Sequence, residues 1–225
     1  MNNPHDKFIK DTLTKKENAV SFLKNYLPHD IRDKINPKDI EIEKDSFVND
    51  ELKEYFSDLL YRVKIDGKEG YIYLLFEHKS YPDKDIGLQL LEYLLQIWKS
   101  KRKQKQMLPA VIPMIIYHGN REWKISTKFS DLINTGDTFS KYIPDFEYIL
   151  YDLSQISDED IIGTDELRAR LLLLRHIRRK DFINKFVQIL EQYDINFLKP
   201  LFKFFRNLFC NLFNLDFFIL LIFLF

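Results

Sequence analysis

The side chains best suited to chemistry in this chain are Asp58, Glu77 and Lys79. Glu77 and Lys79 are two residues apart in a strand-like run, so they are expected on the same face of a sheet. Asp58 lies on the preceding strand-like run, and the short link 66–70 between the two runs is typical of a hairpin that would carry Asp58 across to Glu77. Two carboxylates and one ammonium group are therefore expected at one place.

This group of side chains suits the hydrolysis of a phosphodiester. Asp58 and Glu77, with the backbone carbonyl of His78, would hold Mg²⁺, or Mn²⁺ in its place, because these ions bind through a few oxygen ligands and the substrate phosphate. The metal would lower the pKa of a bound water, and Lys79 would orient that water or neutralise the phosphate. The alternative is a salt bridge at the end of a strand, with no catalytic use.

Gln89 and Tyr93 lie one helical turn apart in the apolar run 86–98 and share a face with Gln96. Polar groups on one face of an otherwise apolar helix could line the same cleft as the acids, with Gln89 in a catalytic role and Tyr93 in contact with DNA. The alternative is the solvated face of an amphipathic helix.

Two basic clusters are candidates for contact with a nucleic-acid backbone, which would make affinity fall with salt. The first directly follows the helix that carries Gln89, and for that reason it is the better candidate. The second, within 168–180, could instead pair with its own acidic neighbours. Charge runs are more often solvated faces. The first cluster consists of Lys99, Lys101, Arg102, Lys103 and Lys105.

The composition describes an ordinary globular chain of 225 residues with 34 basic and 34 acidic residues. Zero formal net charge argues against a protein that coats polyanions wholesale. The single cysteine, Cys210, excludes an internal disulfide and a multi-cysteine zinc cluster. The first residues lack the apolar core of a signal peptide, so we expect a cytoplasmic protein.

The hydrophobic periodicity predicts a helical start, three strands, a helix and two further strands, followed by helices. The run 71–77 is almost continuously apolar, which is typical of a central strand buried on both faces. We expect three parts: a domain over 1–155, a helical subdomain over 156–196 and a tail rich in phenylalanine and leucine over 197–225. The expected strands are 40–47, 55–65, 71–79, 109–117 and 146–153, and the expected helices lie within 4–26, 86–98 and 159–193.

Five segments together resemble the recombination-promoting nucleases, also known as the Rpn or YhgA-like transposase family, within the PD-(D/E)XK nuclease superfamily. The resemblance covers about residues 4–175. The segments are HDKFIKDTL, SDLLYRV, YIYLLFEHKSYPD, LQLLEYLLQIW and PAVIPMIIYHGNREW.

The resemblance implies an α/β fold with a restriction-endonuclease-like αβββαβ core, in which helices flank a mixed central sheet. It also implies Mg²⁺-dependent cleavage of DNA that leaves a 3′-hydroxyl and a 5′-phosphate, with a role in recombination or mobile elements. Asp58 and Glu77 match the family's metal ligands, Lys79 its lysine, and Gln89 with Tyr93 a QxxxY pattern.

The function expected from the sequence is therefore that of a metal-dependent DNA endonuclease. The alternative is a catalytically silent module of the same fold that binds DNA or a protein partner. A homo-oligomer stays open, and a membrane anchor in the tail is the less favoured alternative, because its uninterrupted apolar run, 217–225, is far shorter than the roughly 20 residues that span a bilayer.

Overall fold

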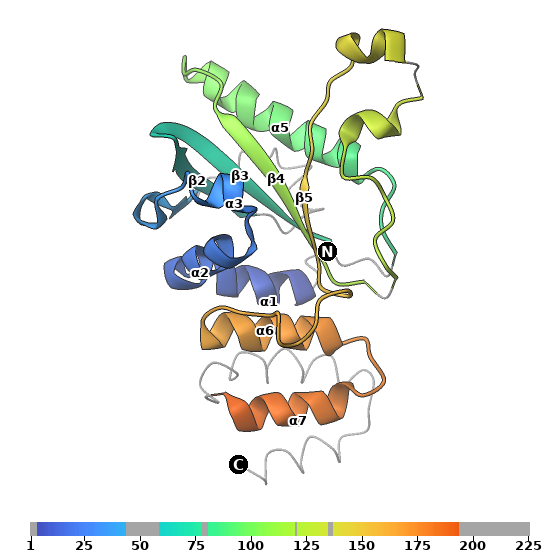
Figure 1. Cartoon of the computed structure of the whole chain (residues 1–225). Coiled ribbons are helices and arrows are strands. Elements are labelled where there is room, and N and C mark those ends of the chain that lie inside the picture. Colours follow the sequence, from blue (N-terminus) through green and yellow to red (C-terminus); the bar gives the residue numbers. More distant parts are fainter. Residues whose placement is uncertain (1–3, 44–58, 78–80, 120, 135–136, 194–225) are drawn as a thin grey trace.

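A mixed sheet of five strands forms the centre of the computed structural model, which describes residues 4–43, 59–77, 81–119, 121–134 and 137–193 (Figure 1). The strands lie in chain order, β1-β2-β3-β4-β5. β1 and β2 are antiparallel, as are β2 and β3, whereas β3, β4 and β5 run parallel. The strands are β1 (Glu41–Ile42), β2 (Leu59–Ile65), β3 (Lys68–Glu77), β4 (Ala110–Tyr117) and β5 (Ile149–Asp152).

The hairpin between β2 and β3 confirms the expected short link. Ile65 pairs with Lys68, so only Asp66 and Gly67 form the loop. Both have positive φ, 50° and 77°, as a type I′ turn requires, and an Asp-Gly pair tolerates this conformation. Because the turn matches the twist of the strands, it sets the register of β2 against β3.

The central strand β3 is buried on both faces, as the apolar run predicts. Ile72, Leu74 and Phe76 belong to the larger hydrophobic core, on the side of α1 and α6. Tyr73 and Leu75 belong to a second core, on the side of α5. The near-continuous apolar sequence therefore serves two cores at once.

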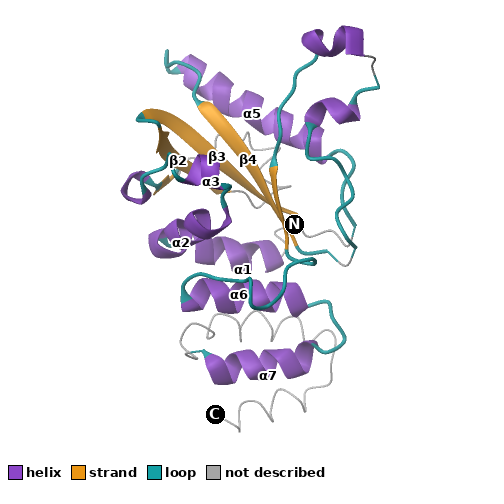
Figure 2. Cartoon of the chain, viewed as in Figure 1, coloured by secondary structure: helices purple, strands orange, loops and turns teal. Residues whose placement is uncertain are grey.

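The helices form a layer on each face of the sheet (Figure 2). On one face α1 (Pro4–Leu13) and α2 (Lys16–Tyr26) pack with α6 (Asp165–His176), and α7 (Phe182–Gln192) packs on α6. On the other face lies α5 (Ile86–Lys103), the crossover that two parallel strands such as β3 and β4 need. The short helices are α3 (His29–Arg32) and the 3₁₀ turns η1 (Pro37–Asp39), η2 (Phe129–Leu132) and η3 (Asp137–Tyr142).

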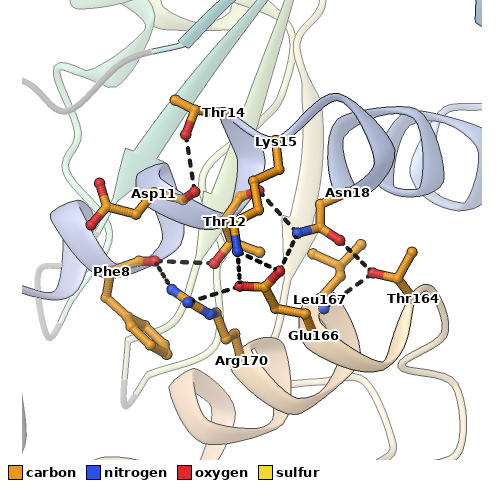
Figure 3. A network of polar contacts seen from close by, with 10 residues as sticks. All are labelled: Phe8, Asp11, Thr12, Thr14, Lys15, Asn18, Thr164, Glu166, Leu167 and Arg170. Carbon is orange, nitrogen blue, oxygen red and sulfur yellow. Dashed lines mark hydrogen bonds and ion pairs between the residues drawn. The ribbon is translucent and has the colours of Figure 1, made fainter. Parts of the chain in front are cut away.

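A polar network joins α6 to the two N-terminal helices (Figure 3). The carboxylate of Glu166 accepts hydrogen bonds from the ammonium group of Lys15 at 2.7 and 2.8 Å and from the amide of Asn18 at 2.9 Å. It also accepts from the guanidinium of Arg170 at 2.9 Å. Thr164 caps α6 by accepting from the amide of Leu167, and its hydroxyl donates to Asn18. The N-terminal helices are thus tied to a helix that follows the sheet in sequence.

The arrangement confirms the mixed α/β fold and the expected order of elements, with helices on both faces of a mixed sheet. No helix within the described ranges is both long and apolar enough to cross a membrane. The predicted boundaries at 155 and 196 stay predictions, and the segment 197–225 lies outside the described residues.

Candidate functional site

The carboxyl ends of the three parallel strands meet at one edge of the sheet, which we call the carboxyl edge. Glu77 pairs with Tyr117 at the end of β4, and Tyr117 pairs with Asp152 at the end of β5. The antiparallel β2 begins at this edge, because its first residue, Leu59, pairs with Leu74, three positions before Glu77. The structure therefore brings the start of β2 and the end of β3 together.

The structure describes only part of the predicted catalytic group. Glu77 is described by its backbone alone, as the last residue of β3. Asp58, His78 and Lys79 lie outside the described residues, although Asp58 directly precedes β2. The predicted convergence of the two carboxylates and the lysine stays a prediction.

Tyr93 packs between α5 and the sheet beneath it. Its ring stacks on that of Tyr73 in β3, with the centroids 4.6 Å apart and the planes at 29°. Tyr93 is only 2% exposed and shares its core with Leu90 and Ile97. The face of α5 that carries Tyr93 is therefore turned to the sheet and not to solvent. Burial does not favour the predicted direct contact of Tyr93 with DNA, which stays a prediction.

Gln89 lies one turn before Tyr93 and is half-buried. Its amide nitrogen Nε2 lies 3.5 Å from Oδ2 of Asp83, which also accepts a hydrogen bond from the amide of Asp85 through Oδ1. The other amide atom, Oε1, is buried and accepts no hydrogen bond from a described residue. A buried carbonyl oxygen without a donor is costly, so this atom is suited to receive one. Asp83 was not among the predicted site residues. The Pro82-Asp83 pair, shortly before the helix that carries Gln89, is the sequence feature that could have indicated it.

The loops after β4 and β5 are held by the carboxylate of Asp152. It accepts from the backbone amides of Trp123, at 3.1 Å, and Ser154, at 2.8 Å. The hydroxyl of Tyr117 donates to the carbonyl of Arg121 at 2.7 Å. His118, which follows β4, is buried at 5% exposure. Asp152 therefore fixes the shape of the carboxyl edge.

Within the described ranges, no group of three His, Cys, Asp or Glu side chains could hold a metal ion. A metal site at the carboxyl edge would depend on Asp58 and on the segment that begins at Glu77.

The basic cluster at the end of α5 lies at the opposite end of β3. The ammonium group of Lys101 is 3.7 Å from the carboxylate of Glu69 and 4.8 Å above the ring of Tyr71, and Lys101 is only 5% exposed. Burial and the nearby Glu69 raise the pKa of Tyr71. At about 3.3 Å per residue, Glu69 is roughly 26 Å from Glu77.

The residues of this cluster differ in whether they are exposed to a DNA backbone. Burial does not favour a phosphate contact for Lys101, whereas Lys99, Arg102 and Lys103 are exposed. Their roles in DNA binding stay predictions. The Lys101 end of α5 lies away from Glu77, because α5 runs away from the carboxyl edge.

The chain is similar in sequence to known proteins over most of its length. The family described as "Putative transposase, YhgA-like" matches residues 3–197. The chain is 28% identical over 193 residues to the recombination-promoting nuclease RpnD of Escherichia coli O157:H7, covering 83% of this chain and 72% of RpnD. It is 26% identical over 193 residues to RpnC of E. coli K12, covering 85% of this chain and 64% of RpnC.

A further relative is named an inactive recombination-promoting nuclease-like protein, RpnE of E. coli K12. It is 27% identical over 186 residues, covering 80% of this chain and 60% of RpnE. The chain thus spans less than two thirds of the length of RpnC and RpnE. No solved structure gives a significant match.

Proposed function

Because the chain belongs to the family of YhgA-like transposases, we propose that it is a metal-dependent DNA endonuclease that acts in recombination or in mobile elements. Relatives named recombination-promoting nucleases support the proposal. The observation that carries it is the register of the sheet: β3 ends at Glu77 in the centre of the carboxyl edge, and β2 begins beside it, directly after Asp58.

The donor set predicted for this edge would suit a hard divalent cation. Asp58 and Glu77 would supply carboxylate oxygens, and His78 a backbone carbonyl, for Mg²⁺ or Mn²⁺. When bound, the ion would supply Lewis acidity and lower the pKa of a water molecule. Lys79 would neutralise the phosphate and hold the attacking water by hydrogen bonding.

The α5 side of β3 supports this placement. Side chains alternate along a strand, so position 77 is predicted on the face of Tyr73 and Leu75, beneath α5. The buried Oε1 of Gln89 belongs to the same helix face as Tyr93, which covers Tyr73. Gln89 would accept a hydrogen bond from a donor of the site and so hold that donor in place.

The test is cleavage of supercoiled plasmid by the full chain with Mg²⁺ or Mn²⁺, compared with Asp58→Asn, Glu77→Gln and Lys79→Met. We expect each variant to lose at least about 100-fold in rate. Glu92→Gln, which removes an exposed carboxylate on α5, is the matched control and should cut like the parent. Wild-type rates in all three site variants would reject the proposed site.

The second candidate is a catalytically silent module that binds DNA. The relative RpnE supports this alternative, because a protein similar in sequence to this chain is named an inactive nuclease-like protein. Plasmid that is bound but never cut by the parent protein, with either metal, would select this alternative.

A further inference from the structure

The end of α6 lies beside the carboxyl edge, whereas the end of α5 lies far from it. Leu153, the first residue after β5, donates its backbone amide to the carbonyl of Tyr117 at 2.9 Å. The guanidinium of Arg175 in the last turn of α6 donates to the carbonyl of the same Leu153 at 2.6 Å. Arg179 donates to the carbonyl of Ser154 at 3.4 Å. Two guanidinium groups thus reach the residues that directly follow β5.

The acid nearest to these groups already has several basic partners. Asp158 accepts from Arg175 at 2.9 Å, lies 2.8 Å from Nε2 of His176, and pairs with Lys185. Burial raises the pKa of Asp158, but the hydrogen bonds from Lys185 and His176 outweigh it, so the pKa is well below its ordinary value. The carboxylate is therefore ionised and shared among Arg175, His176 and Lys185.

Arg179 and Lys180 remain exposed at this place. The segment 175–185 carries five arginine and lysine residues and one acid, Asp181. The adjoining loop adds Glu159 and Asp160, of which Asp160 accepts a hydrogen bond from Ser157. The exposed Arg179 and Lys180 thus closely follow the end of α6, which contacts the residues after β5.

Distance separates the two basic clusters. Neighbouring strands are about 4.8 Å apart, so Glu77 and Asp152, two strands apart in register, are about 10 Å from each other. Lys101 contacts Glu69, roughly 26 Å along β3 from Glu77. One turn of duplex DNA is about 34 Å long and carries a charge every 1.7 Å or so of its axis. The α6 end, whose Arg179 contacts Ser154 two residues after Asp152, therefore lies nearer to Glu77 than the Lys101 end of α5 does.

We propose that Arg179 and Lys180 contact the DNA backbone beside the carboxyl edge and form a phosphate-binding surface of the protein. The inference rests on the proposed nuclease function for its substrate. It assigns the contact to a cluster that sequence reasoning ranked second, behind Lys99 to Lys103.

The experiment measures equilibrium binding of a fluorescent 30-base-pair duplex by the full chain, without divalent metal, as a function of KCl concentration. Arg179→Gln/Lys180→Gln should lower the slope of log K against log salt by about 1.8, since each lost phosphate contact contributes about 0.9. Lys99→Gln/Lys103→Gln, which changes charge equally, should lower the slope by less. Thermal melting checks that both variants are folded.

Two results would overturn the inference: no binding by the parent, or an Arg179/Lys180 variant whose slope falls no more than that of the Lys99/Lys103 variant. A parent that binds with the expected slopes but never cuts plasmid would end the nuclease proposal and leave the binding surface supported. The two failures are therefore distinguishable.

Discussion

Replacement of Glu166 by glutamine should be one of the most destabilising single changes in the chain. The Glu166 side chain is 9% exposed and that of its partner Arg170 only 3%. Burial raises the pKa of Glu166. The hydrogen bonds from Lys15 and Asn18 and the charge of Arg170 together lower the pKa by more than burial raises it, so the carboxyl group is ionised in the folded state. Glutamine keeps an acceptor but removes the charge, which leaves the buried guanidinium without its hydrogen-bonded counter-ion, with only the more distant charge of Asp11 to offset it.

Loss of one partner from a buried ion pair costs about 3–5 kcal/mol. In a chain of 225 residues, about 1 kcal/mol lowers the melting temperature by roughly 2–4 °C. The lower bound of the cost thus corresponds to a drop of about 6–12 °C. Thermal melting and urea unfolding of the full chain, followed by circular dichroism, measure both quantities.

Two further variants test the explanation. Lys15→Met removes a cation whose side chain is 57% exposed, so it should cost less than about 1 kcal/mol. Glu166→Met/Arg170→Met removes both buried charges and should recover much of the stability lost by Glu166→Gln. A Glu166→Gln protein within about 0.5 kcal/mol of the parent would refute this reasoning, because surface substitutions have effects of that size.

Three other outcomes are expected. The pKa of Asp158 lies below its ordinary value of 3.8, so its stabilising effect is present above that pH and lost as pH falls; melting temperatures between pH 5 and 3 should therefore drop less in Asp158→Asn than in the parent. In Gly87→Ala the new Cβ would lie 2.5 Å from Cδ1 of Leu132, but that side chain is 38% exposed and can move aside, and alanine favours a helix by about 1 kcal/mol, so urea unfolding should show a change of less than about 1 kcal/mol. Lys101→Met keeps the buried stem and leaves Glu69, whose side chain is 45% exposed, in contact with solvent, so urea unfolding should show a change below about 1 kcal/mol.

The parts of the fold that sequence predicted well depend on local chemistry. The Asp66-Gly67 turn and the apolar run of β3 each carry their signal within a few residues, through backbone conformation and burial. The helix begins at Ile86 as expected but continues to Lys103, because a charged run can extend a helix beyond its apolar stretch. The shared face of Gln89 and Tyr93 also follows from helical periodicity.

The parts that sequence could not predict depend on distant partners. Lys101 is found in a basic run that is usually solvated, yet Glu69 and Tyr71 give it a buried place at the start of β3. Glu166 and Lys15 are 151 residues apart, so no local pattern joins them. The position of Arg179 depends on how α6 meets β5, which periodicity does not contain.

The contacts between α6 and the two N-terminal helices can form only late in synthesis of the chain. The N-terminal helices leave the ribosome first, but their polar partners Thr164, Glu166 and Arg170 are made about 150 residues later. At 5–20 residues per second this delay is about 8–30 seconds. During that interval the apolar side of α1 is exposed on the nascent chain, because α6, which packs against it in the folded protein, has not yet been made. We therefore expect ribosome-associated chaperones to bind this segment.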